Sequence, residues 1–219
     1  IMGLIFTLVG AYRAVFVSRY FTQMAWFDTI FNSSLLIRTF AMAAELSFAG
    51  LFALALLRVN ADLPATQDTN PGRFKNFLTT QAPYFLIACI FLAQFFAYGG
   101  LIMKSKTSFA IEETLWSMGF LAVLPLSIIQ LRRVFAVKDA EAISSLTMLR
   151  SSTRIIAAWC IIYCSYGVLY HLPLENWPSA MDQLATGIPQ IKTGWVAVKD
   201  SFLIVHESKA YQDWGFGFL

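Results

Sequence analysis

Two apolar stretches separated by a short polar one decide the fold of this chain. Residues 84–103 read YFLIACIFLAQFFAYGGLIM, and residues 110–131 read AIEETLWSMGFLAVLPLSIIQL. Each stretch keeps about 20 mostly apolar residues together, which is enough for an α-helix to cross a hydrocarbon layer roughly 30 Å thick. Only KSKTSF, at residues 104–109, lies between them. The sequence therefore predicts two membrane helices joined in a tight antiparallel hairpin.

Two further apolar stretches flank this hairpin. One covers residues 35–57, and the other covers residues 154–172. We expect the second of these helices to stop at residue 172, because Pro173 and Pro178 follow and proline cannot continue an ordinary helix. The predicted fold class is all-α, a polytopic transmembrane helical bundle with four spans.

The two ends of the chain carry less regular segments. Residues 1–17 fit either a short span interrupted by Arg13 or an amphipathic helix in the membrane interface, and the interfacial helix is favoured. We expect residues 1–175 to form the helical bundle and residues 176–219 to form a mixed extramembrane tail. The stretch 214–219 resembles the start of a further apolar helix that the end of the sequence truncates.

The composition excludes several classes of protein. Of the 219 residues, 58% are hydrophobic and 13% are charged, whereas soluble domains average about 45–50% and 25%. The net charge is only +3, and no basic run interleaved with aromatic residues is present, so we expect no nucleic-acid partner. No phosphate-binding loop, zinc-protease helix, nucleophile elbow or dinucleotide fingerprint occurs. The expected partners are membrane lipid and other membrane-protein subunits.

The sequence predicts no metal site and no certain cofactor. Cys89, Cys160 and Cys164 lie in apolar stretches, where free thiols usually serve as packing residues. Only two histidines are present, which argues against a haem held by two histidines. A bound lipid is the expected ligand, and a pigment is a further option.

Charged residues inside the predicted spans are the strongest functional signal. A charged side chain near the bilayer centre costs about 2.5–3.5 kcal/mol, so such residues normally face the bundle interior. Arg38 and Glu45 lie seven residues apart, two turns or about 10 Å along one helical face. We expect both to point inward, with a gap between them that a phosphate, a carboxylate of another helix or water fills. A structural ion pair and a functional role both remain open for Glu45.

A pair of acids opens the stretch 110–131. Glu112 and Glu113 precede Trp116 by four and three residues, so at least one carboxylate shares a helical face with the indole and is expected to face the bundle. The alternative is that both are first-turn carboxylates at the level of the head groups, where the helix dipole favours them.

A stripe of tyrosines marks the fourth predicted span. Tyr163, Tyr166 and Tyr170 are spaced to share one face, and His171 follows the last of them. Such a stripe is usually core packing, but phenolic hydroxyls within a membrane need partners, and the acids described above are available. His171 is either a proton carrier, a ligand for a pigment metal or a residue of the membrane interface.

Two motifs resemble a group of multi-pass membrane proteins. Residues 26–29 (WFDT) followed by residues 38–46 (RTFAMAAEL) are similar to the pattern F-D-[TS]…R-S-x-A-T-x-A-E-L, and residues 112–116 (EETLW) fit E-E-x-L-W. This pattern resembles the lipocone superfamily, whose members are membrane bundles thought to act on lipids or lipid-linked head groups through inward polar residues. The resemblance implies that Asp28, Arg38, Glu45 and Glu113 converge on one polar pocket.

The chain departs from that family in one motif. Where D-V-P-x-Y is expected, residues 167–171 read GVLYH, so the acidic residue and the proline are missing. Loss of a carboxylate that acts as a general base weakens the case for catalysis, whereas a pocket that only binds a head group survives it.

Three functions follow from these observations, and whether the protein is an enzyme stays open. The first is an accessory or structural subunit of a larger membrane complex, of the energy-transducing kind found in an organelle inner or thylakoid-type membrane, that binds lipid or pigment. The second is a lipocone-type enzyme that modifies a lipid head group with Arg38, Glu45 and Glu113 as catalytic residues. The third is a small carrier or channel. The predicted ligand-binding residues are Asp28, Arg38, Glu45, Glu112, Glu113, Trp116, Tyr170 and His171.

Overall fold

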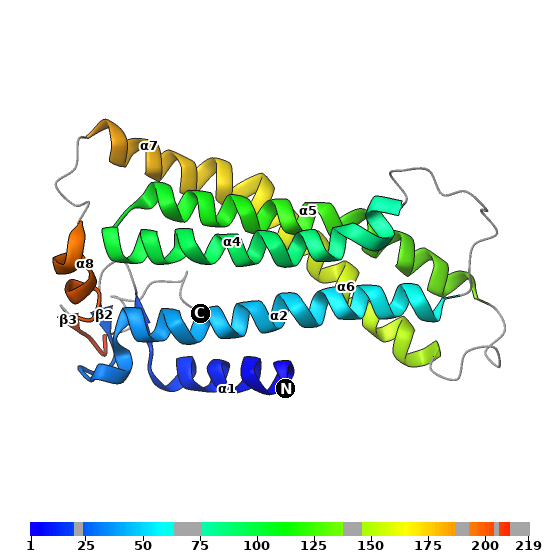
Figure 1. The fold of residues 1–219 in the computed structure, drawn as a ribbon, viewed down its shortest axis with the longest axis horizontal. Coiled ribbons are helices and arrows are strands. Elements are labelled where there is room, and N and C mark those ends of the chain that lie inside the picture. Colours follow the sequence, from blue (N-terminus) through cyan, green and yellow to red (C-terminus); the bar gives the residue numbers. More distant parts are fainter. Residues whose placement is uncertain (20–23, 64–75, 138–145, 187–192, 204–205, 211–219) are drawn as a thin grey trace.

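The architecture is a bundle of long apolar helices (Figure 1). The structure, a computed structural model, describes residues 1–19, 24–63, 76–137, 146–186, 193–203 and 206–210. Within these ranges four helical segments are long and apolar enough to cross a membrane: Ser34–Asp62, Phe77–Met103, Lys106–Ala136 and Thr147–Ala185. The predicted all-α transmembrane bundle is therefore confirmed, and the chain is an integral, multi-pass membrane protein.

The elements follow one another in a simple order. The helices are α1 (Met2–Val15), a 3₁₀ turn η1 (Ile30–Asn32), α2 (Ser34–Asp62), a π-helical turn η2 (Phe77–Gln81), α4 (Ala82–Met103), α5 (Lys106–Ala136), α6 (Leu146–Tyr163), a π-helix η4 (Cys164–Asn176), α7 (Trp177–Ala185) and α8 (Gly194–Asp200). Three two-residue strands, β1 (Ser18–Arg19), β2 (Met24–Ala25) and β3 (His206–Glu207), form a small sheet at one end of the bundle.

Helices α4 and α5 form the predicted antiparallel hairpin. Lys104 turns the chain in the left-handed conformation, with φ of 57°, and the Ser105 hydroxyl caps α5 by accepting from the Ser108 N–H at 3.2 Å. The two helices come close together at Gly119, where a Cβ would lie 2.9 Å from Leu86 Cδ1. The close contact of α4 and α5 therefore depends on a residue without a side chain at this position.

A buried amide on α7 holds this hairpin in place. Gln183 is 1% exposed; its Oε1 accepts from the Lys106 N–H at 2.6 Å, and its Nε2 donates to the Lys104 carbonyl at 2.8 Å. Both backbone groups lie at the turn, where no helical hydrogen bond is available to them. Gln183 is not among the residues predicted from the sequence.

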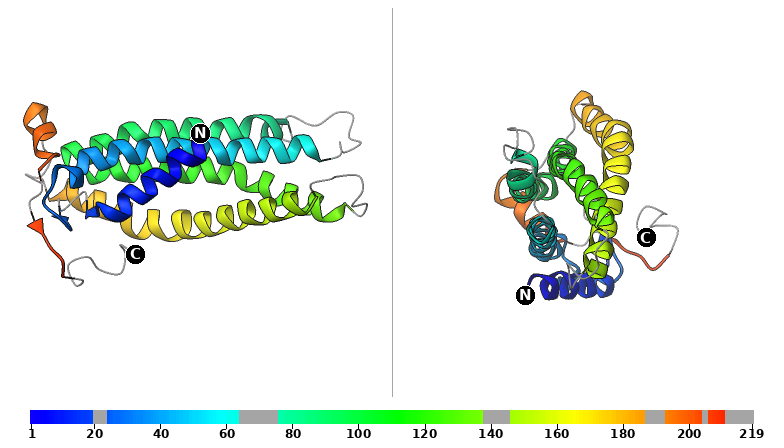
Figure 2. Two further views of the ribbon diagram at one scale, coloured as in Figure 1. Left: turned by 90° about the horizontal axis from the view of Figure 1, so that it is seen from below. Right: turned by 90° about the vertical axis from the view of Figure 1, so that its right-hand side faces the viewer.

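The fourth long helix does not end at residue 172, so that prediction is wrong. α6, η4 and α7 follow one another without interruption to residue 185 and cross the outer face of α5 obliquely (Figure 2). Pro173 lies inside η4. Proline removes one backbone hydrogen bond of a helix, and π-helical winding is one way in which a membrane helix tolerates that loss. Pro178 lies in the first turn of α7, where its missing N–H costs little.

α1 packs against the first half of α2. The Phe6 and Phe48 rings lie 5.6 Å apart, and the Tyr12 and Phe40 rings lie 4.8 Å apart. α1 thus runs alongside α2 from one end to its middle (Figures 1 and 2), and with 14 residues it is shorter than the four candidate spans, so its placement as an interfacial helix stays a prediction. The further helix predicted at residues 214–219 lies outside the described residues.

An aromatic core lies between α2, α5 and α6. Phe120 is fully buried, and its ring centroid lies 5.5 Å from that of Phe52 and 4.5 Å from that of Tyr163. Cys160 and Cys164 belong to this core, and all three cysteines are buried and free, as expected of packing residues. This core supports the residues of the polar site from one side.

Candidate functional site

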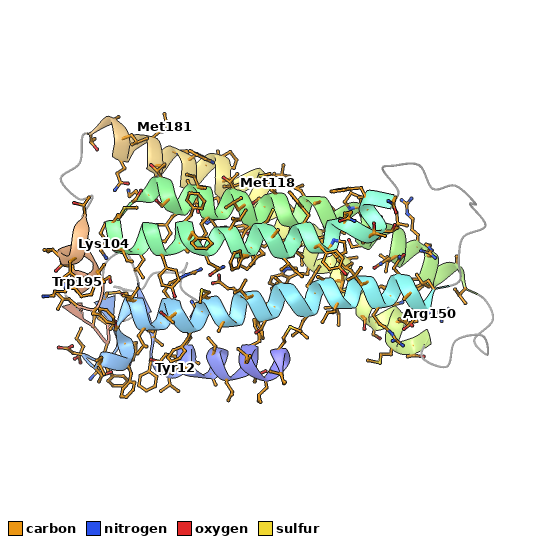
Figure 3. The ribbon with its side chains drawn as sticks, viewed as in Figure 1. Tyr12, Lys104, Met118, Arg150, Met181 and Trp195 are labelled. Atoms are coloured by element: carbon orange, nitrogen blue, oxygen red, sulfur yellow. The ribbon has the colours of Figure 1, made fainter. Side chains whose placement is uncertain are left out.

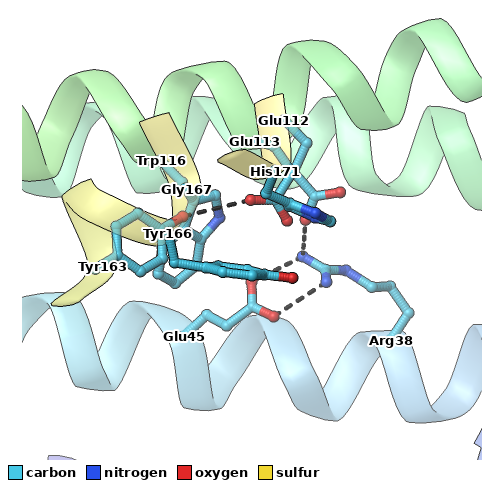
Figure 4. A pocket seen from close by; sticks show the side chains of 9 residues that line it. All are labelled: Arg38, Glu45, Glu112, Glu113, Trp116, Tyr163, Tyr166, Gly167 and His171. Atoms are coloured by element: carbon cyan, nitrogen blue, oxygen red, sulfur yellow. Dashed lines mark hydrogen bonds and ion pairs between the residues drawn. The ribbon is translucent and has the colours of Figure 1, made fainter. Parts of the chain in front are cut away.

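Arg38 and Glu45 form the centre of a polar network inside the bundle (Figure 4). Arg38 Nη1 donates to Glu45 Oε1 at 3.0 Å, and Nη2 donates to Glu45 Oε2 at 2.8 Å. Both side chains face the interior, which confirms that prediction. The expected gap between them is wrong, because the extended side chains of arginine and glutamate together bridge the two helical turns.

Gln94 of α4 completes this part of the network. Arg38 Nη2 also donates to Gln94 Oε1 at 2.7 Å, and Gln94 Nε2 donates to Glu45 Oε2 at 3.0 Å. Gln94 is 3% exposed. Gln94 is not among the residues predicted from the sequence, although a single amide in the middle of an apolar span is a signal of the same kind as Arg38 and Glu45.

Glu112 and Glu113, the two acids of α5, face the bundle interior on the side of Arg38 and Glu45. Glu112 Oε1 lies 3.3 Å from Arg38 Nη2, and the Glu112 side chain is 9% exposed. Glu113 Oε2 accepts a hydrogen bond from the Tyr163 hydroxyl at 3.3 Å. The prediction that at least one of these acids faces the bundle is confirmed for both.

η4 closes the site from the other side. His171 Nδ1 lies 2.6 Å from Glu175 Oε2, and the imidazole stacks on Tyr166 with ring centroids 5.3 Å apart. Tyr170 does not line the pocket and is half exposed, so the structure does not bring it together with the other predicted ligand-binding residues. The Tyr170 ring packs against that of Tyr166, with centroids 5.8 Å apart, so the two tyrosines share a face of η4 as predicted although only Tyr166 lines the pocket.

These side chains surround a pocket of about 310 Å³ between α2, α5 and η4 (Figure 4). It reaches the flank of the bundle, because the side chains of Glu45 and His171 are 20% and 27% exposed and Tyr166 is 53% exposed. Its lining residues are Arg38, Glu45, Glu112, Glu113, Trp116, Tyr163, Tyr166, Gly167 and His171.

Six of the eight predicted ligand-binding residues line this pocket. The two that do not are Tyr170 and Asp28. Asp28 is exposed at the end of the bundle, where its backbone N–H donates to Glu207 Oε2 at 3.1 Å. The segment before α2 packs against β3 and not beside Arg38, so the implied convergence of Asp28 with the other residues is wrong.

Comparison with protein-family models, with curated proteins and with solved structures gives no match. The resemblance to the lipocone superfamily therefore stays a prediction.

The chemistry of the site follows from its charges and its rings. Three carboxylates, those of Glu45, Glu112 and Glu113, line the pocket with one guanidinium. Arg38 is already engaged by two of the three, so a phosphate would have to displace carboxylates that hold it. Within the described residues no group of three or more His, Cys, Asp and Glu side chains is arranged to hold a metal ion. The arrangement favours a ligand that donates hydrogen bonds or carries positive charge.

Proposed function

We propose that this membrane protein binds the polar head group of a membrane amphiphile in the pocket between α2, α5 and η4, and that this head group carries an ammonium. The observation that supports the proposal most directly is the excess of carboxylates over guanidinium in a pocket within the bundle. In a medium of low dielectric constant this excess has to be offset by protons or by a cationic group.

Glu113 is the carboxylate best placed to receive the ammonium. Glu45 and Glu112 are paired with Arg38, whereas the direct partner of Glu113 among the described residues is the neutral hydroxyl of Tyr163. Trp116, Tyr163 and Tyr166 line the same pocket. Aromatic faces attract cations, and several around one site are typical of quaternary ammonium recognition.

The position of the pocket suits an amphiphile. Its volume of about 310 Å³ is at the lower end of the range of ligand pockets, so it has room for a head group but not for acyl chains. Tyr166 and Leu169 on the adjoining flank are 53% and 73% exposed, which leaves apolar surface beside the opening for the chains.

We expect Glu113→Gln to lower the affinity for a short-chain alkyltrimethylammonium by about tenfold or more, because it removes a carboxylate charge that attracts an ammonium about 4 Å away by about 4 kcal/mol at an effective dielectric constant of about 20. The probe is hexyltrimethylammonium, titrated into the purified protein in a neutral detergent and followed by calorimetry. Asp62→Asn is the matched control, since it removes the same charge at the far end of α2, where Asp62 pairs with Arg58, and it should bind as the unmodified protein does. Equal or tighter binding of hexyl phosphate would contradict the proposal.

The second candidate function is an enzyme that modifies a lipid head group, as the lipocone resemblance implies. The observation that favours it is the contact of His171 Nδ1 with Glu175, because a carboxylate that orients an imidazole leaves Nε2 to act as a general base or acid. If a panel of lipids is turned over, we expect His171→Gln to lower the rate by about 10²–10⁴-fold and Glu175→Gln to lower it less. Turnover that is unchanged in both variants would exclude this role for the pair.

Membership of a larger membrane complex, in an organelle or elsewhere, stays a prediction, as do pigment binding and a carrier or channel function. The observation in favour of a complex is the surface of α8, where Trp195 and Val196 are 70% and 69% exposed outside the four long helices. Another membrane subunit is the expected occupant. Migration of the chain as a single protein after mild solubilisation of native membranes would contradict this hypothesis.

A further inference from the structure

The two ends of the bundle differ in charge. Arg150 lies at the end where α2 and α5 finish and α6 begins, and Lys104 lies at the opposite end (Figure 3). Among the described residues, the Arg150 end carries one acid, Asp62, and the basic residues Arg58, Arg132, Arg133, Arg150 and Arg154. The elements at the opposite end carry both signs: the α4–α5 turn and α5 carry Lys104 and Lys106, α7 and α8 carry Asp182, Lys199 and Asp200, and the segments at the small sheet carry Asp28, Glu207 and Lys209.

Two of these arginines are held on a single aromatic ring. The guanidinium carbons of Arg150 and Arg154 lie 5.6 Å and 4.5 Å from the centroid of Phe135, which connects α6 with α5. Arg150 Nη2 donates to the Val137 carbonyl at 3.1 Å, and its Nε is buried without a hydrogen-bond partner. Neither arginine forms an ion pair with a carboxylate of the described residues.

A bound anion would relieve the repulsion between these two arginines. Like charges four residues apart on a helix repel each other, and the shared ring fixes both in place. Phosphate suits two neighbouring guanidinium groups, because each presents N–H donors in a planar fork that matches the phosphate oxygens. The surroundings suit a lipid, since Met148 and Ile155 on the same helix are 72% and 70% exposed and offer apolar contact beside the charges.

We propose that Arg150 and Arg154, held over Phe135, bind the phosphate of an anionic phospholipid, and that this end of the bundle faces the cytoplasmic side of the membrane, where basic loops are enriched. The proposal does not depend on the pocket between α2, α5 and η4, which lies elsewhere along the bundle and is rich in carboxylates. Each basic residue near an anionic membrane surface contributes about 1 kcal/mol, so the two together correspond to about 30-fold in affinity.

The test is a titration of the purified full chain in a neutral detergent with phosphatidylglycerol and, separately, with phosphatidylcholine of the same acyl chains, read as lipid adducts by native mass spectrometry. We expect phosphatidylglycerol to bind more tightly, and the double variant Arg150→Gln, Arg154→Gln to lose about 30-fold of that affinity. The control is Lys199→Gln, Lys209→Gln, which removes two charges at the opposite end and should leave the preference intact. Equal loss in both double variants, or no preference for phosphatidylglycerol, would overturn the proposal.

Two further experiments test whether the ligand is a lipid or free phosphate, and which side of the membrane this end of the bundle faces. Displacement of phosphatidylglycerol by inorganic phosphate would assign the site to free phosphate and not to a lipid. A Thr147→Cys variant, at the start of α6 in a chain whose own cysteines are buried, should react with a membrane-impermeant thiol reagent from the cytoplasmic face of a bacterial inner membrane. Reaction from the opposite face alone would reject the proposed orientation.

Discussion

Arg38→Met is expected to lower the free energy of unfolding by about 3–5 kcal/mol, because it leaves buried carboxylates without their cation. Arg38 holds Glu45 through two hydrogen bonds and lies 3.3 Å from Glu112, and Gln94 loses a donor at the same time. The measurement is denaturant-induced unfolding of the purified protein in mixed micelles, followed by circular dichroism.

Arg58→Met is the matched control for this prediction. Arg58 lies on the same helix, but its side chain is 77% exposed and pairs with Asp62 at 2.7 Å. An exposed pair of this kind contributes about 0–1 kcal/mol, so the control should unfold nearly as the unmodified protein does. The double variant Arg38→Met, Glu45→Leu is expected to recover part of the loss, because it removes an unpaired carboxylate as well. Equal stability of the two single variants would show that the network does not stabilise the bundle.

Phe120→Ala is expected to lower the free energy of unfolding by about 3–5 kcal/mol, because it opens a cavity in the aromatic core. The ring is fully buried and lies between those of Phe52, Trp116 and Tyr163. The same unfolding measurement applies. The loss should also weaken ligand binding in the pocket, since Tyr163 and Trp116 pack on this ring and line the pocket.

Phe95→Ala provides the comparison for the core substitution. Phe95 lies on α4, is 63% exposed, and has its ring 5.4 Å from that of Phe91, which is itself half exposed. Removal of a ring on the outer face leaves no internal cavity, so a change below about 1 kcal/mol is expected. Similar losses in both variants would mean that Phe120 does not support a packed core.

The sequence predicted the architecture because a membrane leaves few alternatives. A run of about 20 apolar residues can satisfy its backbone in lipid only as a helix, and a five- or six-residue link forces two such helices to be antiparallel. The same argument predicted the inward orientation of Arg38, Glu45 and at least one of the two acids at the start of α5, since a charged residue in an apolar run has to avoid lipid.

The errors arose where the prediction depended on details of winding or packing. Proline was expected to end the fourth helix, but Pro173 is accommodated by a π-helix, which no local signal in the sequence indicates. Tyr170 lies outside the pocket lining although its ring packs on that of Tyr166, which lines the pocket. Asp28 was placed in the pocket by resemblance alone, and the packing of its segment against residues 206–207 depends on contacts between the distant ends of the chain.

The length of the last membrane helix has a consequence for the pocket. The segment Thr147–Ala185 has 39 residues, nearly twice the number of about 20 that an upright helix needs to cross the hydrocarbon layer. It runs obliquely across α5 and moves away from α2 along its course (Figure 2). Two rods that cross at an angle separate steadily beyond the crossing point, and Arg38 lies in the wedge between them. An upright helix at this position would occupy that space and leave no room for a ligand.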